Sequence, residues 1–405
     1  TGCSNPVEVA ETCGLSSTCL PYGNYYLINQ SQVDQFSQMY PECYQLGGDL
    51  VISGEDIINL DGLQQITSVD SNLYIGDWDV NQATSLTGLN GLNNLYAVGG
   101  NVEIAGNYSL VSLSGLESLA SIGKSLKLIS DNNLENISDL ENLQSIGSTI
   151  QLWHNNLNSL EGFEGIDSIG GDLIIYDCNS IRDLNGLQNL KTVGGLVNIA
   201  ENPELVNFEG LNSLRSTGAG LVINNNPNLT NLDALSNLTD IGSNTLAITA
   251  NISLNSIVGI ENISPSTIDW LYLYYNSLLS YCHIPNICEF LELFPYENYV
   301  SSNATGCEDV YEIEAACEEV GVNELPVTKN LRIFPNPATD VIFIETPGIS
   351  YEKRVEIFNA FGQQMLKKST SGLSCWVDVS NLPTGLYFVK VIGGKGIQMG
   401  KFVKE

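Results

Sequence analysis

The sequence predicts a mostly β chain, in which a right-handed, β-helix-like solenoid of about ten turns is followed by a separate β-sandwich. Three observations predict this organisation. Apolar residues recur about every 24 residues between residues 50 and 280, cysteines gather on both sides of that repeat, and the repeat stops before a C-terminal segment of different composition. A chain of 405 residues also exceeds what one hydrophobic core usually organises.

Each repeat begins with two apolar residues separated by one position, which predicts a short strand with two inward side chains. Apolar residues then follow at every third position, which predicts an extended or tightly turned return path. The repeats begin at Leu50, Leu73, Val102, Leu126, Ile150, Leu173, Val197, Leu221, Leu246 and Leu271. The step from Leu73 to Val102 is five residues longer than the period, so we expect a bulging loop near residues 77–85.

An asparagine follows most repeat starts by five residues and predicts a ladder that pairs backbone polar groups where each strand bends. The ladder positions are Asn107, Asn155, Asn202, Asn226, Asn251 and Asn276. Cys178 stands at the same position of its own repeat, and leucine-rich repeats accept cysteine there. We therefore interpret Cys178 as structural, with a reactive or dimerising thiol as the alternative.

Cysteines outside the repeat predict two disulfide-bonded caps in an oxidising compartment. Cys3, Cys13, Cys19 and Cys43 precede the repeat, and Cys282, Cys288, Cys307 and Cys317 follow it. Each set of four allows three pairings, which stay open. Zinc held by Cys282, His283 and Cys288 is an alternative, although this spacing is not a CxxC pair. Apolar spacing in residues 31–40 predicts a helix in the first cap, with Ser31 and Asp34 as its capping pair.

The C-terminal segment has a different pattern. Residues 321–330 contain Pro326 and no repeat, and we interpret them as a linker. Apolar runs at residues 341–345, 355–358, 376–379 and 386–391 are separated by Gly, Pro and Asn, which predicts an immunoglobulin-like β-sandwich over residues 331–405.

Charge separates the two parts of the chain and excludes two classes of partner. Residues 331–405 hold nine Lys and Arg against six Asp and Glu, so they carry +3 of the net −31 and residues 1–330 carry −34. An acidic surface repels phosphates, so we expect neither nucleic acid nor anionic lipid as a main partner.

No apolar run reaches the roughly 20 residues that span a bilayer. The chain begins at Thr1, and we expect that an export signal has been removed before it.

The repeat spacing L-x-I-x-x-N-x-x-L-x-x-L-x-x-L-x-x-L-x-x-I-G resembles the leucine-rich, receptor-L-domain-like solenoids of bacterial surface proteins. Cys43 before residues 46–52 is similar to the start of such domains, and residues 282–317 are similar to their closing cap. The resemblance implies an N-terminal cap at residues 1–49, a solenoid at 50–280 and a C-terminal cap at 281–320.

The last segment resembles the type A sorting domain of type IX secretion substrates in Gram-negative bacteria. The resemblance rests on four motifs, at residues 334–338, 357–359 with Gly362, 378–387 and 401–404. Within them, the residues expected to form the sorting signal are Pro335, Asn336, Pro337, Gly362, Leu382, Pro383, Gly385, Tyr387, Lys401 and Lys404. It implies periplasmic transit, passage through the type IX translocon and cleavage by a surface sortase between Cys317 and Leu331. The body would then be anchored on the outer-membrane surface or released.

Catalytic motifs are absent from the sequence. The chain has two histidines, His154 and His283, without a recognisable partner for either, and no GxSxG, HExxH or P-loop pattern. We therefore expect no enzyme activity, cofactor or metal. A hydrolase with carboxylates facing one another across turns is the least favoured alternative.

The outward strand face offers the better candidate site. Trp153 and Tyr176 stand on adjacent strands, and the candidate ligand-binding residues are Trp153, Tyr176, His154, Asp177, Glu201 and Gln151. Aromatic rings beside carboxylates and amides suit stacking on sugar rings or anchoring a protein. The alternative is that these rings only stabilise the sheet. We expect Tyr272, Tyr274 and Tyr275 to pack on the closing cap.

These patterns together predict a secreted or surface-attached binding protein, either an adhesin or a module that captures a glycan or a protein. The alternative is a structural surface-layer component without a specific ligand.

Overall fold

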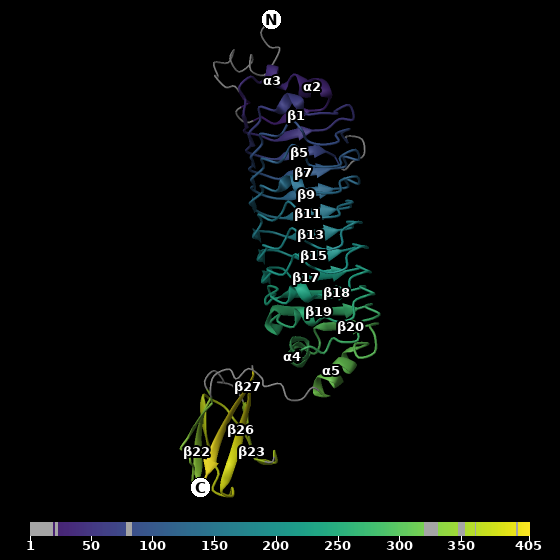
Figure 1. The fold of residues 1–405 in the computed structure, drawn as a ribbon. Helices are drawn as coiled ribbons and strands as arrows, with labels where there is room; N and C mark the ends of the chain where they lie inside the picture. The colour runs from purple at the N-terminus through teal and green to yellow at the C-terminus, as the bar shows by residue number, and fades with distance from the viewer. Residues whose placement is uncertain are drawn as a thin grey trace. The chain divides into compact units, whose positions relative to one another are not determined.

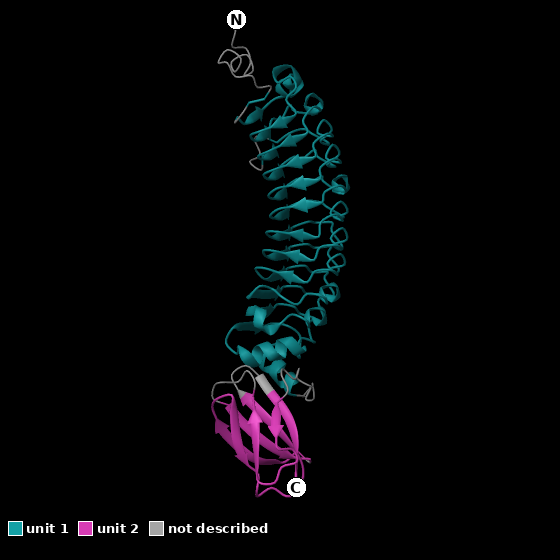
Figure 2. Ribbon diagram, turned by 90° about the vertical axis from the view of Figure 1, so that its left-hand side faces the viewer, with its two compact units in different colours: residues 1–319 teal, residues 320–405 magenta. Residues whose placement is uncertain are grey.

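The computed structural model describes residues 19–20, 23–77, 83–319, 331–346, 353–360, 362–393 and 396–405. The chain divides into two compact units, Thr1–Glu319 and Val320–Glu405 (Figure 2). Each unit has its own hydrophobic core. The two are therefore described separately.

The first unit is built on a parallel sheet of twelve strands that follow one another in chain order (Figure 1). The strands are β1 (Tyr25–Leu27), β3 (Leu50–Ile52), β5 (Leu73–Gly76), β7 (Val102–Ala105), β9 (Leu126–Ile129), β11 (Ile150–Trp153), β13 (Leu173–Tyr176), β15 (Val197–Ala200), β17 (Leu221–Asn224), β18 (Asn244–Thr249), β19 (Ile268–Tyr274) and β20 (Asn298–Ser301). The register pairs Leu50 with Leu73, and continues through every expected repeat start to Leu246 with Leu271. Strands β1 and β20 lie beyond the ten starts seen in the sequence.

A second parallel sheet runs along the same unit, where the sequence indicated only an extended return path. It contains eight two-residue strands: β2 (Gln45–Leu46), β4 (Ser68–Val69), β6 (Ala97–Val98), β8 (Ser121–Ile122), β10 (Ser145–Ile146), β12 (Ser168–Ile169), β14 (Thr192–Val193) and β16 (Ser216–Thr217). Glycines follow these strands because the backbone of one repeat touches the next. A Cβ on Gly147 would lie 2.1 Å from the Gly123 carbonyl oxygen, closer than any side chain tolerates.

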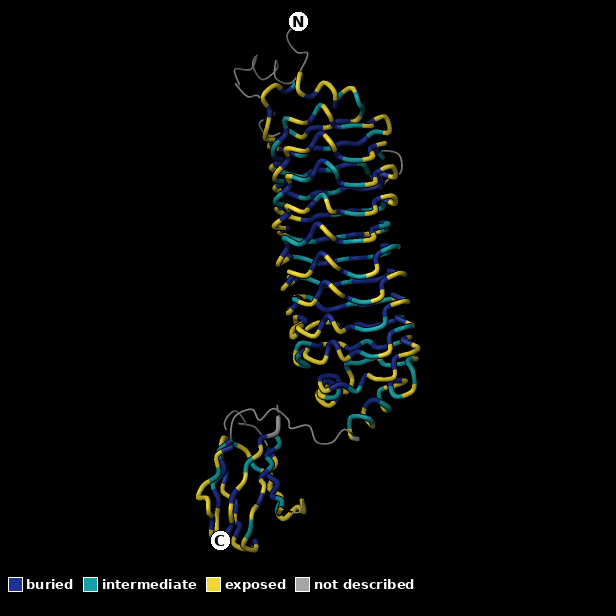
Figure 3. The backbone as a smooth tube through the Cα atoms, in the orientation of Figure 1, coloured by how far each residue is buried: buried dark blue, intermediate teal, exposed yellow. Residues whose placement is uncertain are grey.

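The core of the first unit consists mainly of buried aliphatic residues, which every repeat contributes. Figure 3 shows buried stretches recurring in the successive turns of the backbone. Short 3₁₀ helices complete several repeats, namely η1 (Asp61–Leu63), η2 (Ser138–Leu140), η3 (Asp233–Leu235), η4 (Val258–Ile260) and η5 (Pro265–Thr267). Each fully buried aliphatic side chain contributes about 1.5–3 kcal/mol. A repeat buries them only against its neighbours, so stability is collective and both ends need a cover. The insertion expected near residues 77–85 falls largely on residues 78–82, which lie outside the described residues.

Two short helices cover the first end, α2 (Gln30–Asp34) and α3 (Phe36–Met39). The expected capping pair was wrong. Asn29 is the N-cap, and its side chain accepts a hydrogen bond from the Gln32 N–H at 3.0 Å. Asn29 has the extended backbone that a cap needs, whereas Ser31 lies inside the first turn. Cys19 and Cys43 form a disulfide in this cap, and Cys3 and Cys13 lie outside the described residues.

The other end is covered by α4 (Pro285–Leu293) and α5 (Val310–Glu319). Two disulfides join Cys282 to Cys307 and Cys288 to Cys317. The zinc alternative is therefore wrong, because both cysteine sulfurs that it needs are bonded to other sulfurs.

The second unit contains two antiparallel sheets that enclose a small core. One sheet has the order β21 (Arg332–Phe334), β22 (Val341–Glu345) and β25 (Ser374–Asp378), and the other has the order β24 (Gln364–Thr370), β23 (Lys353–Asn359), β26 (Gly385–Gly393) and β27 (Gly396–Lys404). Four of these strands overlap the four apolar runs of the sequence. The other three, β21, β24 and β27, lie outside those four runs. The expected linker at residues 321–330 lies outside the described residues.

Candidate binding surface on the first sheet

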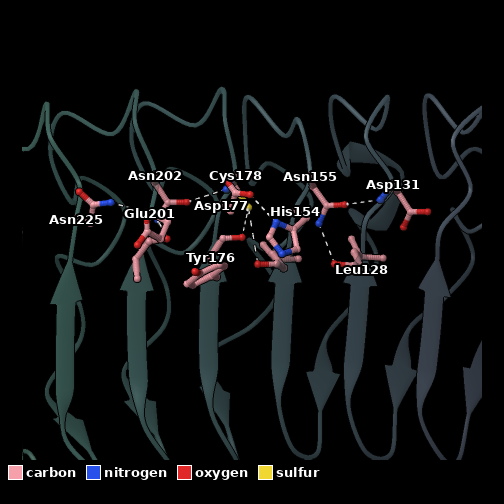
Figure 4. A network of polar contacts seen from close by, with 12 residues as sticks. Leu128, Asp131, His154, Asn155, Tyr176, Asp177, Cys178, Glu201, Asn202 and Asn225 are labelled. Atoms are coloured by element: carbon pink, nitrogen blue, oxygen red, sulfur yellow. Dashed lines mark hydrogen bonds and ion pairs between the residues drawn. The ribbon is translucent and has the colours of Figure 1, made fainter. Parts of the chain in front are cut away.

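From β7 to β20, the residue after each strand of the first sheet bends the chain through a left-handed backbone conformation. The φ angle is 55° at His154, 53° at Asp177, 60° at Glu201 and 48° at Asn225. This conformation is uncommon for residues other than glycine. Its repetition on successive strands places these four polar side chains in one column beside the strand ends (Figure 4).

The two aromatic residues expected to be neighbours do lie together. Trp153 pairs with Tyr176 in the register of β11 and β13, and their ring centroids are 5.8 Å apart in an edge-on arrangement. Trp153 is 40% exposed, and the His154 ring stacks against it with centroids 5.3 Å apart. The rings thus pack on one another and still present a surface to solvent.

His154 has a partner that the sequence did not reveal. Its Nδ1 lies 2.5 Å from Asp177 Oδ2, and both side chains are partly exposed. The interpretation that His154 has no partner was therefore wrong. The sequence did not reveal the pair because the two residues are 23 positions apart and meet only across adjacent repeats. Farther along the column, Asn225 Nδ2 donates a hydrogen bond to Glu201 Oε2.

Gln151, the sixth candidate residue, lies at the second position of β11 between Lys127 and Ile174. It is half-buried on the outward face and lies two residues before Trp153 in the same strand. Its amide therefore borders the aromatic pair from within the sheet.

A buried ladder runs directly behind the column. Asn202 accepts a hydrogen bond from the Cys178 N–H at 3.0 Å and donates from Nδ2 to the carbonyls of Ile175 and Ala200, both at 3.0 Å. Asn226, Asn251 and Asn276 likewise accept a backbone N–H from the preceding repeat and donate to one of its strand carbonyls. The ladder holds the strand ends in register and so holds the column in place.

Cys178 lies in this ladder with its side chain fully buried and its thiol free. Burial raises the pKa of the thiol to about 12, because a thiolate would lose its hydration there. The thiol is thus neutral and enclosed at physiological pH.

One ladder residue was missed in the sequence. Asp131 stands 24 positions after Asn107, accepts the Asn107 N–H at 2.8 Å on Oδ1, and donates its own N–H to Asn155 Oδ1 at 3.1 Å. The spacing of 24 would have located it, but a search for Asn or Cys passes over Asp.

A second aromatic group lies on the same sheet near its other end. Tyr275 is 60% exposed and Trp270 is 47% exposed, so the expectation that the tyrosines there pack on the closing cap was wrong for Tyr275. Tyr274 does contact the cap strand β20, with its ring 5.3 Å from that of Tyr299. Tyr272 stacks beside Trp270 at 6.5 Å and is half-buried. Strand alternation turns Trp270, Tyr272 and Tyr274 to the outward face, whereas Tyr275 follows the strand in the left-handed bend, with a φ of 58°.

In the second unit, the sorting-signal residues meet at the last strand. Asn336, between Pro335 and Pro337, accepts the Val403 N–H at 2.9 Å and donates to the Lys401 carbonyl at 3.4 Å. Lys404 forms a bridge with Ala338, next to this segment.

The other sorting-signal residues shape the turns. The Tyr387 hydroxyl donates to the Pro383 carbonyl at 2.8 Å, between buried Leu382 and the start of β26 at Gly385. Gly362 has a φ of 78°, which favours glycine, and its N–H donates to the Asn359 carbonyl at 3.0 Å. The four sorting-signal motifs, which are separated in the sequence, therefore all contribute contacts to the fold of the second unit.

Comparison with known families agrees with this second unit. Residues 332–405 match the family described as "Secretion system C-terminal sorting domain". No leucine-rich-repeat or receptor L-domain family matches the chain, and no curated protein matches it. Among the described residues, the helices are all too short or too polar to cross a membrane. The matched domain implies interaction with the type IX secretion machinery and supports export of the chain to the cell surface or outside.

Proposed function

We propose that the exported chain is a binding protein whose ligand lies on the outward face of the first sheet. The observation that carries this proposal is the exposed Trp153 ring beside Tyr176, bordered by the His154–Asp177 pair. Aromatic rings with polar neighbours supply most of the binding energy in many recognition sites. The twelve parallel strands in unbroken chain order support the further proposal that this unit is a right-handed leucine-rich solenoid.

The chemistry of the face favours an uncharged glycan as the ligand. Between the two aromatic groups, the outward positions of β15, β17 and β18 carry only uncharged side chains, of which Asn198, Val222 and Asn224 are partly exposed and Ala200, Ala247 and Thr249 are buried. Strands are about 4.8 Å apart, so this uncharged track from Tyr176 to Tyr274 is about 19 Å long. The acidic repeats repel anionic polymers. A neutral sugar chain can stack on the rings and donate its hydroxyls to the carboxylates.

The His154–Asp177 pair serves binding in this proposal and not catalysis. A carboxylate that orients a histidine is one part of a nucleophilic site, which also needs a hydroxyl or thiol within hydrogen-bond reach. In the part of the chain that the structure describes, Asp177 is the partner of His154, and no serine, threonine or cysteine is hydrogen-bonded to the ring. The pair thus fixes the imidazole beside Trp153.

The test is the double variant Trp153→Ala and Tyr176→Ala, measured on an array of glycans and host proteins. Loss of two anchoring rings costs about 2 kcal/mol or more, so we expect binding to fall at least about 30-fold. Tyr96→Ala is the matched control, because Tyr96 is an exposed ring beside the second sheet and outside the proposed site.

Unchanged binding of the double variant would refute the site. Wild-type protein that binds nothing on the array, but assembles regularly on cell surfaces in electron micrographs, would instead support a structural surface-layer role.

A further inference from the structure

Every asparagine in the ladder uses both ends of its amide. The oxygen accepts a backbone N–H from the preceding repeat in Asn155, Asn202, Asn226, Asn251 and Asn276, whereas in Asn107 it accepts the Thr84 hydroxyl at 2.7 Å. In each of these residues the NH₂ group donates to a strand carbonyl of the preceding repeat. Asn155 donates to the Leu128 carbonyl at 2.8 Å, and Asn107 donates to the Ile75 carbonyl at 3.0 Å. A ladder position therefore needs one acceptor and one donor, which an amide always supplies.

Asp131 meets only half of this requirement when it is ionised. Its Oδ1 accepts from the Asn107 backbone and from Asn107 Nδ2, the latter at 3.2 Å. Its Oδ2 is buried and has no hydrogen-bond partner among the residues that the structure describes. The carbonyl equivalent to Leu128 in the preceding repeat is that of Ile104, because these two residues are paired in register. A carboxylate has no hydrogen to donate there, whereas a protonated carboxyl does.

No cation offsets a charge on Asp131 in the described surroundings. Glu103 of β7 and Lys127 of β9 lie on the outward face of the sheet and pair with each other at 3.3 Å. In the next repeat, His154 pairs with Asp177, and Glu135 in the following segment is exposed. Burial raises the Asp131 pKa to about 7, although the hydrogen bonds from Asn107 and from the Ile129 backbone oppose this rise.

We propose that Asp131 is a proton-operated element of the ladder, complete when its carboxyl is protonated and broken when it is ionised. In the protonated form it joins the repeats of β7, β9 and β11, immediately before the His154 column. Ionisation removes the hydrogen-bond donor and places a charge in a buried site. Both changes weaken the packing between the repeats of β7, β9 and β11. The proposal concerns the ladder alone and stands whether or not the neighbouring surface binds a glycan.

The direction of the pH effect follows from the two states of the carboxyl. The folded-state pKa lies above the unfolded value of 3.8, so the folded protein holds this proton when the unfolded chain has lost it. Stability therefore falls as pH rises from about 4 to about 7 and levels off above that range.

The test compares the full-length wild type with Asp131→Asn in thermal and denaturant unfolding between pH 4.5 and 8.5. Asparagine supplies the missing donor, so we expect the variant to be more stable than the wild type at pH 8. The ratio of their folding constants should change by up to about tenfold per pH unit between pH 5 and 7, and then stay constant. A difference that does not vary with pH would overturn the proposal.

Two further variants separate this element from a general charge effect. Glu135→Gln removes an exposed carboxylate on the same repeat and should leave the pH dependence of the wild type unchanged. Asn155→Asp should add a second loss of stability with rising pH, because it places a carboxylate at the next ladder position. Hydrogen exchange at the Asn107 amide, which donates to Asp131, should be faster at pH 8 in the wild type than in Asp131→Asn. Equal protection in both proteins would exclude local loosening.

Discussion

At the scale of single residues, the ladder shows how one side chain can satisfy several buried backbone groups. Asn202 serves the Cys178 N–H and the carbonyls of Ile175 and Ala200, and none of these groups has access to bulk water. A buried polar group without a partner costs about 1–3 kcal/mol. Stacked repeats thus need the ladder, because the bend after each strand leaves buried backbone groups that only a side chain can pair.

We expect Asn202→Ala to lower the free energy of unfolding by about 3 kcal/mol or more, because it leaves three backbone groups unpaired. Denaturant unfolding of the purified protein measures this change. The control is Asn132→Ala, since Asn132 is exposed and should tolerate the change within about 0.5 kcal/mol. Similar small losses in both variants would contradict the role of the ladder.

At the scale of elements, the two ends of the first unit are stabilised differently from its middle. A central repeat is covered on both sides by other repeats, whereas α4 and α5 cover the last one. The Cys288–Cys317 disulfide joins these two helices across 29 positions. Cross-linking of this kind stabilises a segment that is too small to build a core of its own.

We expect the double variant Cys288→Ser and Cys317→Ser to destabilise the closing cap by about 3–4 kcal/mol, from the length of the loop that the bond closes. Hydrogen exchange should rise first in α4 and α5, while the strands around Asn202 keep their protection. Reduction of the wild type is no substitute, because it also opens Cys282–Cys307. Uniform loss of protection along the unit would show that the cap is not a separate element.

At the scale of the whole chain, the two units have separate cores and opposite charge. The core of the second unit consists of residues 331–402 alone, and that of the first ends at Ile313 with Cys317 packed against it. We therefore expect the first unit to fold without the second. The family match assigns the second unit to export.

We expect a chain truncated after residue 330 to show the same unfolding transition for the first unit as the full-length protein. The same truncation should keep the protein inside the producing cell, which fractionation of a native host detects. A matched variant with the full second unit but Trp153→Ala should still be exported. Loss of the transition on truncation would disprove the independence of the units.

The sequence by itself determined the repeat, the strand starts and the position of the caps. These features depend on spacing along the chain, and periodic apolar residues such as Leu126 and Ile150 must face one core whatever the details of their packing. The sorting domain was likewise recognisable from short motifs in order, which the family match supports. Even the ladder could be located, because a buried strand end needs a polar side chain.

The tertiary structure alone decided which residues meet across repeats. The His154–Asp177 pair, the second sheet and the unpaired Asp131 Oδ2 all depend on contacts between neighbouring repeats, about 24 residues apart in the chain. The physical reason is that periodicity specifies which way a side chain points, whereas its partner depends on the register and distance of the neighbouring strand.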